Sequence, residues 1–310
     1  MELFPLGLVL ISALLHASWN YFAKGNDDPP AMIWCVMTAS LLVYAPIFLN
    51  RLPGARFAPD AWIYILATGI LHAFYISTLG IAYQTGELSK VYPLARGSAP
   101  LMTAGTAALF LGERISPAGG LAIFLVVGGI FVSHLEPGED RGWRLPFRRG
   151  SGAAVRWALA TGMMTALYSV VDKVGVTRVS PEIYIYLMFI LTCLLLAPVY
   201  LTGSRAALVR SNFKDGKSIF HVLLAGAFMM GSYGLLLFAL QMNKVSYVVA
   251  ARGVSVILAA GLGVFLLKES GQRQKLIGAA LVAAGLVILA LTRETARRLN
   301  PSSAPRGPCG

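Results

Sequence analysis

Two arginines lie within long apolar segments, where a charged side chain is unusual. Arg96 and Arg252 each fall roughly five to nine residues inside a predicted membrane span. An arginine near the centre of a membrane helix costs about 2.5–3.5 kcal/mol on insertion scales, so it normally faces a cavity or a partner. Its planar fork fits carboxylate, phosphonate or phosphate groups. Both arginines are therefore predicted to bind an anionic group. The alternative is a structural role, in which each one binds carbonyls of a neighbouring helix or extends to lipid headgroups.

Side chains on the same helical faces extend this candidate binding site. Tyr92 lies four residues before Arg96, and Ser255 lies three residues after Arg252. Residues at these spacings are neighbours on a helix surface, so both are predicted to contact the same solute. Pro100 shares the face of Arg96, and a proline in a membrane helix frees backbone groups that can line a cavity. Simple kinking for helix packing is the alternative for this proline.

Two histidines near the centres of the first and third spans are candidates for carrying a coupling proton. Imidazole changes its charge near neutral pH, which suits His16 and His72 either to proton coupling or to binding the solute. A neutral buried histidine bonded to a neighbouring helix is the alternative. Trp19 shares a helical face with His16, as in a polar aromatic cavity wall, and Tyr168 occupies the matching position in the second half. Both aromatic residues join the predicted substrate-binding residues.

Carboxylates, by contrast, are predicted at span ends. Asp172, Glu182 and Glu87 fall near the boundaries of apolar segments, so no carboxylate is expected near the middle of a span. Glu113 and Glu269 follow the fourth and ninth spans. We expect these two glutamates to anchor loops by bonding helix N-termini or basic groups, because the positive end of a helix dipole attracts a carboxylate.

The composition shows what kind of elements must hold these residues. The chain has 310 residues, of which 56% are hydrophobic and 13% charged, and its mean hydropathy is +0.68. Soluble domains carry about 25% charged residues, so much of this surface must face lipid. The net charge of +12 comes from residues at segment ends and in loops. That distribution favours contact with anionic lipid headgroups over nucleic-acid binding.

Sequence patterns for metals, cofactors and nucleotides are lacking. The three cysteines, Cys35, Cys193 and Cys309, have neither CxxC nor metal-type spacing, so no disulfide framework and no metal site is predicted. No Walker motif indicates ATP-driven transport, and no cofactor is expected. The N-terminal apolar segment lacks a basic region and a clear cleavage site. It is therefore predicted to be the first span, not a removed signal peptide.

Ten apolar segments are long enough to cross a bilayer core of about 30 Å as helices. Each is bounded by charged or turn residues, and none has the polar alternation of a barrel strand. The all-α integral membrane protein that they predict has spans at Leu3–Phe22, Pro30–Leu49, Trp62–Tyr83, Leu88–Leu111, Pro117–Leu135, Ala153–Val171, Ile183–Leu201, Ser218–Leu240, Val245–Leu267 and Leu276–Thr292.

The spans form two halves of similar sequence. The tetrapeptides LARG and AARG contain Arg96 and Arg252, and a glutamate follows each arginine by 17 residues. Further pairs at nearly constant spacing are Gly69 with Gly226, Ala82 with Ala239, Gln84 with Gln241, Ala17 with Ala166, Trp19 with Tyr168 and Lys24 with Lys173. Because five spans per half is an odd number, the second half is predicted to enter the membrane upside down. Inverted repeats supply the two near-equivalent packings that alternating access requires.

Each half resembles an EamA domain of the drug/metabolite transporter superfamily. The resemblance rests on the LFLGE sequence at Leu109–Glu113, on Pro100 thirteen residues before that glutamate, and on the glycine-bearing span at Ala118–Val132. The second half keeps the glutamate and the glycines of its last span, Glu269, Gly278 and Gly285. It departs from the first half in having Val256 in place of the proline and Lys268 before the glutamate.

The resemblance covers the chain from Leu3 to Thr292. It implies a ten-helix transporter in the inner (plasma) membrane, with repeats at residues 1–135 and 153–292 joined by a linker at 136–152. The basic tail at residues 293–310 is predicted to be disordered. The resemblance implies no particular substrate, because the superfamily carries amino acids, sugars, nucleotide sugars, organic phosphates and drugs.

The predicted function is secondary transport, as an exporter or exchanger, of a small anionic or zwitterionic metabolite such as an amino acid or organic phosphate. Small multidrug exporters of the superfamily use a mid-span carboxylate to exchange protons for cationic drugs. The expected lack of one disfavours a cation exporter but leaves it as an alternative. An integral membrane enzyme acting on lipid-linked substrates is the alternative from another class. Membrane lipids are expected partners, and the oligomeric state, including a homodimer, stays open.

The orientation of the chain is also left open by the sequence. The family resemblance implies cytoplasmic termini. Under that arrangement ten Lys and Arg residues lie inside, fourteen lie outside and two lie within spans, which accounts for all 26. The positive-inside rule therefore points weakly to the opposite orientation.

Overall fold

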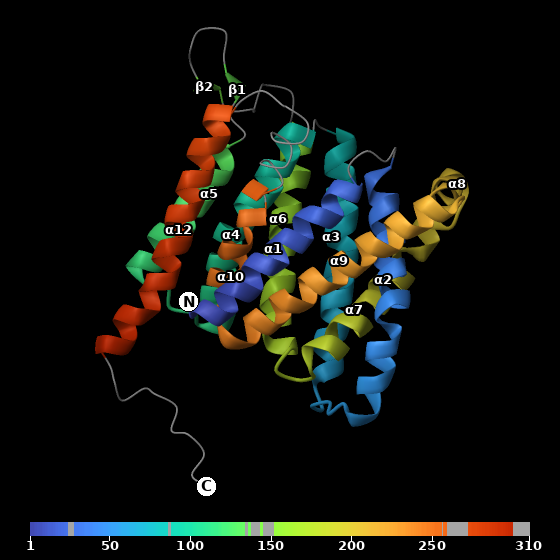
Figure 1. Ribbon diagram of the computed structural model, residues 1–310, viewed down its shortest axis with the longest axis horizontal. Coiled ribbons are helices and arrows are strands. Elements are labelled where there is room, and N and C mark those ends of the chain that lie inside the picture. Colours follow the sequence, from blue (N-terminus) through green and yellow to red (C-terminus); the bar gives the residue numbers. More distant parts are fainter. Residues whose placement is uncertain are drawn as a thin grey trace.

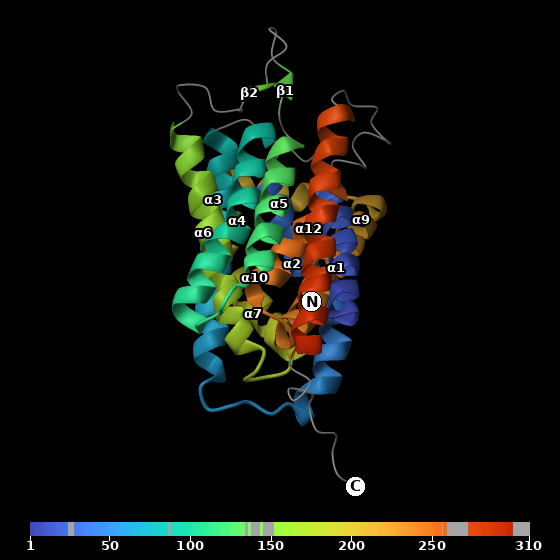
Figure 2. The same ribbon diagram turned by 90° about the vertical axis from the view of Figure 1, so that its left-hand side faces the viewer.

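The computed structural model describes residues 1–23, 28–85, 88–133, 136–137, 143–144, 152–255, 257–258 and 272–299. Its long helices pack side by side into one bundle (Figures 1 and 2). The elements in chain order are α1 (Leu3–Ala23), α2 (Pro29–Arg51), η1 (Leu52–Gly54), α3 (Ala61–Thr85), α4 (Leu88–Leu111), α5 (Pro117–Val132), β1 (Glu136–Pro137), β2 (Trp143–Arg144), α6 (Gly152–Gly175), α7 (Pro181–Tyr200), α8 (Gly203–Ser211), α9 (Gly216–Met242), α10 (Val245–Arg252) and α12 (Gln272–Leu299).

Side-chain caps fix where several helices begin. Asp28, Ser116 and Asp215 precede α2, α5 and α9, and each accepts a hydrogen bond from the backbone N–H three residues later. Such caps satisfy backbone donors that have no partner within the helix. The bond from the Ser218 N–H holds the pKa of the Asp215 carboxyl below its ordinary value. Prolines in the first turns of α2, α5 and α7 suit the same positions, because proline lacks an N–H group.

The predicted spans agree with the observed helices in part. Within the described residues, seven helices are long and apolar enough to cross a membrane, namely α1, α2, α3, α6, α7, α9 and α12. Helix α5 is apolar but has 16 residues, and α4 has the bounds of the predicted fourth span. Two short helices, η1 and α8, were not predicted. The predicted linker contains β1 and β2, which pair antiparallel.

The ninth predicted span, Val245–Leu267, differs from a continuous helix. Helix α10 ends at Arg252, because the N–H of Gly253 bonds to the carbonyl oxygen of Ala250, three residues back, at 2.9 Å. This tighter turn interrupts the α-helical pattern. The interruption is one residue long, because residues 254–255 and 257–258 are helical again. Residues 259–271, including Glu269, lie outside the described part of the chain.

Helices α5 and α12 form a close antiparallel pair. Helix α5 runs toward the end of the bundle that carries β1 and β2, and α12 runs toward the opposite end (Figure 2). A Cβ atom on Gly129 would lie 2.6 Å from the carbonyl oxygen of Gly278, and one on Gly285 would lie 2.8 Å from that of Ala122. Glycine at these positions lets the two backbones touch, as small residues do in membrane helix pairs.

Helix contacts between the halves recur when the halves are exchanged. Helix α1 of the first half packs against α9 of the second, and their counterparts α6 and α3 also pack together. Helix α2 likewise packs against α9, and the counterpart pair α7 and α3 is in contact as well. Two glycines matched in the sequence repeat lie at such crossings. A Cβ on Gly69 would lie 2.5 Å from Leu191 Cδ2, and one on Gly226 would lie 2.8 Å from the backbone nitrogen of Ser40. The matched glycines therefore mark equivalent close contacts.

Glu113 joins the two halves at a helix N-terminus. Its carboxylate accepts bonds from the N–H of Val245 at 2.7 Å, the N–H of Ser246 at 3.3 Å and the hydroxyl of Ser246 at 2.7 Å. These two residues begin α10. The prediction that Glu113 anchors its loop to a helix N-terminus is therefore confirmed.

We predict that Gly129→Ala destabilises the protein and that Gly128→Ala does not. The added methyl group at position 129 would collide with the backbone of α12, and overpacking of this kind costs about 1–3 kcal/mol. The melting temperature of the purified protein in detergent measures the effect. Gly128 is the matched control, because a Cβ there would have no neighbour within 4 Å. Equal melting temperatures for the two variants would contradict the close packing of α5 and α12.

Candidate functional site

A small cavity lies inside the bundle and is bordered by both halves. Its volume is about 60 Å³. Eight helices contribute the side chains around it: His16, Trp19, Ile33, Met37, His72, Tyr75, Ile76, Arg96, Tyr168, Phe189, Met229, Ser232, Tyr233 and Arg252. No carboxylate is among these described lining residues, whereas two are arginines. The cavity is thus mostly apolar and aromatic, with two arginines and two histidines at its wall.

The geometry around His16 fixes its protonation. Trp19 donates its indole N–H to His16 Nδ1 at 3.1 Å, and Arg252 Nη2 lies 3.2 Å from the same nitrogen. Indole and guanidinium groups only donate, so Nδ1 must be the unprotonated nitrogen and the ring hydrogen must lie on Nε2. Within the described residues, neither His16 Nε2 nor Arg252 Nε has a hydrogen-bond partner, although both atoms are buried. Leaving a buried donor unpaired costs about 1–3 kcal/mol, so both N–H groups favour an acceptor in the cavity.

Tyrosines hold the two arginines of the site. Arg96 donates from Nη2 to the hydroxyl of Tyr75 at 2.9 Å, and its guanidinium carbon lies 5.9 Å from the centre of that ring. The guanidinium carbon of Arg252 lies 5.1 Å from the ring centre of Tyr233. A cation placed over an aromatic face gains roughly 0.5–2 kcal/mol. These contacts orient both guanidinium groups at the cavity.

One side of the cavity is an aromatic wall. His72 stacks on Tyr168 with ring centres 4.0 Å apart. Tyr75 and Tyr233 meet Tyr168 edge to face, at 5.6 and 6.2 Å. Rings packed in this way have few rotamers and present both apolar faces and polar hydroxyls. The wall therefore suits a solute that has an apolar part beside its charged group.

Asp172 lies near a helix end, as the sequence predicted, but it is fully buried, which the sequence did not indicate. It lies in the last turn of α6, yet none of its surface is exposed. Thr68 and Tyr184 donate hydroxyl bonds to Oδ1 at 2.5 and 2.8 Å, and Tyr233 donates to Oδ2. These partners belong to α3, α7 and α9, which pack over the end of α6. A position near a helix end therefore did not mean a position near the surface.

The structure brings most of the predicted site residues together. Six of them line the cavity: Arg96, Arg252, Trp19, Tyr168, His16 and His72. Ser255 is buried but does not line it. The backbone of Tyr92 belongs to α4, and its side chain lies outside the described part of the chain.

Two tyrosines of the site were missed in the sequence. Tyr75 lies three residues after His72, on the same helical face, and this spacing could have revealed it. Tyr233 had no comparable signal, because its match in the first half is an isoleucine, Ile76. Its role depends on contacts with Arg252 and Asp172, which lie on other helices.

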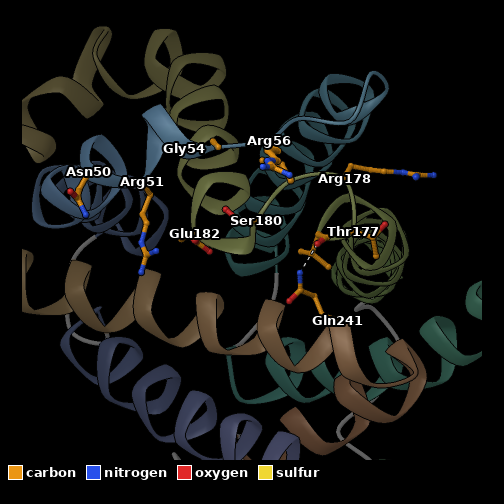
Figure 3. A pocket seen from close by; sticks show the side chains of 12 residues that line it. Asn50, Arg51, Gly54, Arg56, Thr177, Arg178, Ser180, Glu182 and Gln241 are labelled. Carbon is orange, nitrogen blue, oxygen red and sulfur yellow. Dashed lines mark hydrogen bonds between the residues drawn. The ribbon is translucent and has the colours of Figure 1, made fainter. Parts of the chain in front are cut away.

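A second and larger pocket lies at one end of the bundle. Its volume is about 740 Å³, and it is bordered by the end of α2, by η1, by the α6–α7 turn and by the end of α9 (Figure 3). The labelled side chains include Arg51, Glu182 and Gln241. Gln241 donates to the carbonyl oxygen of Val176 at 2.6 Å, and Arg178 forms an ion pair with Asp60 at 3.2 Å. This pocket is polar and separate from the central cavity.

Two repeated helical units around an internal cavity that is bordered by two arginines define a multi-pass membrane transporter. The family model of the EamA-like transporter family matches residues 3–135 and again residues 152–291. Since these matches cover most of the chain, the protein belongs to the EamA-like transporter family, within the drug/metabolite transporter superfamily. This is a family of membrane transporters and not of enzymes. The resemblance seen in the sequence is confirmed.

A solved structure supports the fold. One crystal structure of a protein has a similar fold, with a TM-score of 0.69 and 18% sequence identity. The match covers 96% of this chain and 99% of the other. At this identity the similarity concerns the fold alone. No curated protein sequence gives a significant match.

We predict that His16 is a neutral ring with its hydrogen on Nε2. Nitrogen NMR of protein labelled in its histidine rings, at neutral pH in detergent, should show one ring with an unprotonated Nδ1 and a protonated Nε2. This ring should disappear from the spectrum of His16→Gln, and the chain has only four histidines to resolve. The opposite form, with hydrogen on Nδ1, would contradict the hydrogen-bond arrangement with Trp19 and Arg252.

Proposed function

We propose that the protein is a secondary transporter of a small anionic or zwitterionic metabolite, such as an amino acid or an organic phosphate, and that this solute binds in the central cavity. The unpaired N–H groups of His16 and Arg252 are the main support. Both are donors, and both belong to residues that line the cavity. A carboxylate or phosphate has several acceptor oxygens and can bond both donors at once.

The charge of the cavity supports an anion over a cation. Arg96 and Arg252 bring two positive charges to a small buried space, and no described lining residue is acidic. Like charges held together away from water repel each other, and an anion between them would offset this cost. Asp172 is bound by hydroxyl groups behind the wall of the cavity. A lipophilic cation would meet repulsion here, so the cation-exporter alternative is less well supported.

The size of the cavity supports a small solute. Pockets for drug-sized ligands have volumes of about 300–1,000 Å³, whereas this cavity has about 60 Å³. The space admits a charged group or a few water molecules. Side chains must therefore move apart for a whole metabolite to enter, as expected for a transporter between its open states.

We infer that transport proceeds by alternating access between two inverted repeats of five spans each, in the inner (plasma) membrane. Three observations support the inversion: the matched positions of Arg96 and Arg252, the helix contacts that recur on exchange of the halves, and the antiparallel pairing of α5 with α12. Helices α4 and α5 and the segment beginning with α10 would complete ten spans. Inverted repeats of this kind place the binding site near the bilayer midplane.

Binding to the purified protein across a solute panel tests the proposed solute class. The panel contains amino acids, organic phosphates and lipophilic cations, and calorimetry in detergent measures affinity. Binding by anionic or zwitterionic solutes is expected. Binding by lipophilic cations alone would show that the proposed class is wrong.

We predict that Arg252→Ala weakens binding of the tightest panel solute by at least about 100-fold. Losing a charged hydrogen-bond donor in a buried site costs about 3 kcal/mol, and each 1.4 kcal/mol is a tenfold change. Arg252→Lys should restore binding only in part, because a point charge replaces a planar fork. Arg156→Ala, at an exposed position near the start of α6, is the matched control and should bind normally. Near-normal binding by a monodisperse Arg252→Ala protein would assign this arginine a structural role.

A further inference from the structure

We propose that Asp172 is a proton-binding site whose protonation strengthens binding of the anionic solute, so that one proton and one anion cross the membrane in the same direction. This inference rests on the proposed transport function. It is carried by a continuous set of hydrogen bonds that joins Asp172 to His72, a residue of the cavity wall.

Thr68 connects the carboxyl group to the imidazole ring. Its hydroxyl oxygen lies 2.5 Å from Asp172 Oδ1 and 3.1 Å from His72 Nδ1. His72 Nδ1 also lies 2.9 Å from the backbone carbonyl oxygen of Thr68. A hydroxyl group donates one hydrogen and can accept others. The direction of these bonds therefore depends on whether Asp172 carries a proton.

Two arrangements satisfy the network. When Asp172 is ionised it only accepts, so Thr68 donates to it, and His72 carries its hydrogen on Nδ1 and donates to an oxygen of Thr68. When Asp172 is protonated it donates to the hydroxyl of Thr68, which donates to Nδ1, so the ring hydrogen lies on Nε2 and the ring must shift away from the carbonyl oxygen of Thr68, which Nδ1 no longer bonds. Three proton transfers convert the first arrangement into the second. His72 Nε2 accepts a proton, the hydrogen of His72 Nδ1 passes to the hydroxyl oxygen of Thr68, and the hydroxyl hydrogen of Thr68 passes to Asp172. The ring stays neutral in both arrangements.

The exchange changes what the cavity offers to a solute. His72 Nε2 is an acceptor when Asp172 is ionised and a donor when Asp172 is protonated. A donor is complementary to an anionic oxygen, and the negative charge behind Tyr233 is removed at the same time. By reciprocal linkage, a proton that strengthens anion binding is itself bound more tightly when the anion is present. The transporter that has bound the anion therefore also holds the proton, and the two cross the membrane together.

The other groups around Asp172 permit both states. The hydroxyl of Tyr184 lies 2.8 Å from Asp172 Oδ1 and 3.4 Å from the carbonyl oxygen of Tyr64, which is a second acceptor. The Lys173 ammonium donates to carbonyl oxygens of Leu240 and Asn243. The titratable and charged groups nearest the site are His72 on α3, Tyr184 on α7, Tyr233 on α9, Arg252 on α10 over the Tyr233 ring, and Tyr168 and Lys173 on α6 itself.

Asp172 lies between the central cavity and the pocket at the end of the bundle. Val176 borders that pocket, and its N–H donates to the backbone carbonyl oxygen of Asp172 at 3.0 Å. The backbone of Asp172 is thus one helical turn from a residue that borders this pocket. On its other side Tyr233 and the Thr68–His72 pair separate it from the cavity. This position suits a group that exchanges protons with both.

The network is built from both halves and has no second copy at the matched positions. At the spacing of the sequence repeat, the counterparts of Asp172, Thr68, His72 and Tyr233 are Ala23, Ala225, Met229 and Ile76. None of these counterparts can bind or relay a proton. The arginines, in contrast, are present in both halves. The chain therefore has a duplicated site for the anion and a single site for the proton, from which we infer one proton per transport cycle.

His16 is less suited to this task than His72. Its Nδ1 already accepts from Trp19 and lies beside the guanidinium of Arg252. If Nδ1 of His16 carried a proton, its N–H group would point at the N–H donors of Trp19 and Arg252, with no acceptor among the three. The expectation that His16 or His72 carries the coupling proton becomes, in this proposal, a role for His72 as the relay to Asp172.

Infrared difference spectroscopy of the purified full-length protein tests the proton site without a solute. As the pH is lowered, the unmutated protein should gain the carbonyl band of a protonated carboxyl group, and Asp172→Asn should lack this band. Thr68→Val should shift its midpoint by about half a pH unit or more, because one donor to the carboxylate is lost. Thr103→Val, at a buried hydroxyl on α4, is the matched control and should leave the midpoint unchanged. A titrating band that persists unchanged in Asp172→Asn would overturn the proposal.

Proteoliposomes test the coupling, with labelled L-glutamate and glycerol 3-phosphate as probes. An acidic exterior should accelerate uptake by the unmutated protein about fivefold or more, in line with typical coupling energies. Asp172→Asn and His72→Gln should lose this acceleration and still exchange labelled for unlabelled probe. The second variant keeps the test decisive if the first does not fold. Exchange that ignores the pH gradient in the unmutated protein would refute coupling. Absence of exchange for both probes would count against the proposed solute classes, and the infrared titration would still decide whether Asp172 binds a proton.

Discussion

The burial of the Arg252 guanidinium group is the constraint on which the rest of the site depends. A permanent cation in the protein interior requires neighbours that accept hydrogen bonds or that present an aromatic π face. His16 meets the first requirement by presenting an unprotonated Nδ1, and Tyr233 meets the second. One cation therefore determines which nitrogen of His16 carries hydrogen and which ring face Tyr233 presents.

Tyr233 links the two chemical functions that we propose. Its ring faces the guanidinium of Arg252, and its hydroxyl donates to Asp172. The positive site for the anion and the buried carboxyl group are thus separated by one side chain. Opposite charges at this separation influence each other strongly where water is scarce. A proton on Asp172 and an anion beside Arg252 can therefore be coupled without any large movement of the backbone between them.

Symmetry and its absence have different roles in this protein. The repeat supplies paired arginines, paired glycines at helix crossings and close contacts between α5 and α12. Glu113 adds a link from one half to the first turn of α10 in the other. The paired arginines and paired glycines suit two packings of similar energy. The hydroxyl and carboxyl network of α3, α6, α7 and α9 is present once, so it distinguishes the two packings and can give transport a driving force.

The sequence by itself determined the helical membrane class, the family, the starts of most helices, the paired arginines and the helix-terminal role of Glu113. These features depend on local hydrophobicity, on capping side chains and on the repeat, all of which are visible along one chain. Only the tertiary structure decided that α10 ends at Arg252, that Tyr75 and Tyr233 hold the arginines, and that Asp172 is buried. Asp172 is near a helix end in sequence, and its depth is set by α3, α7 and α9, which come from distant parts of the chain. The burial of a charged group depends on which helices cover it, and helix packing is a property of the whole fold.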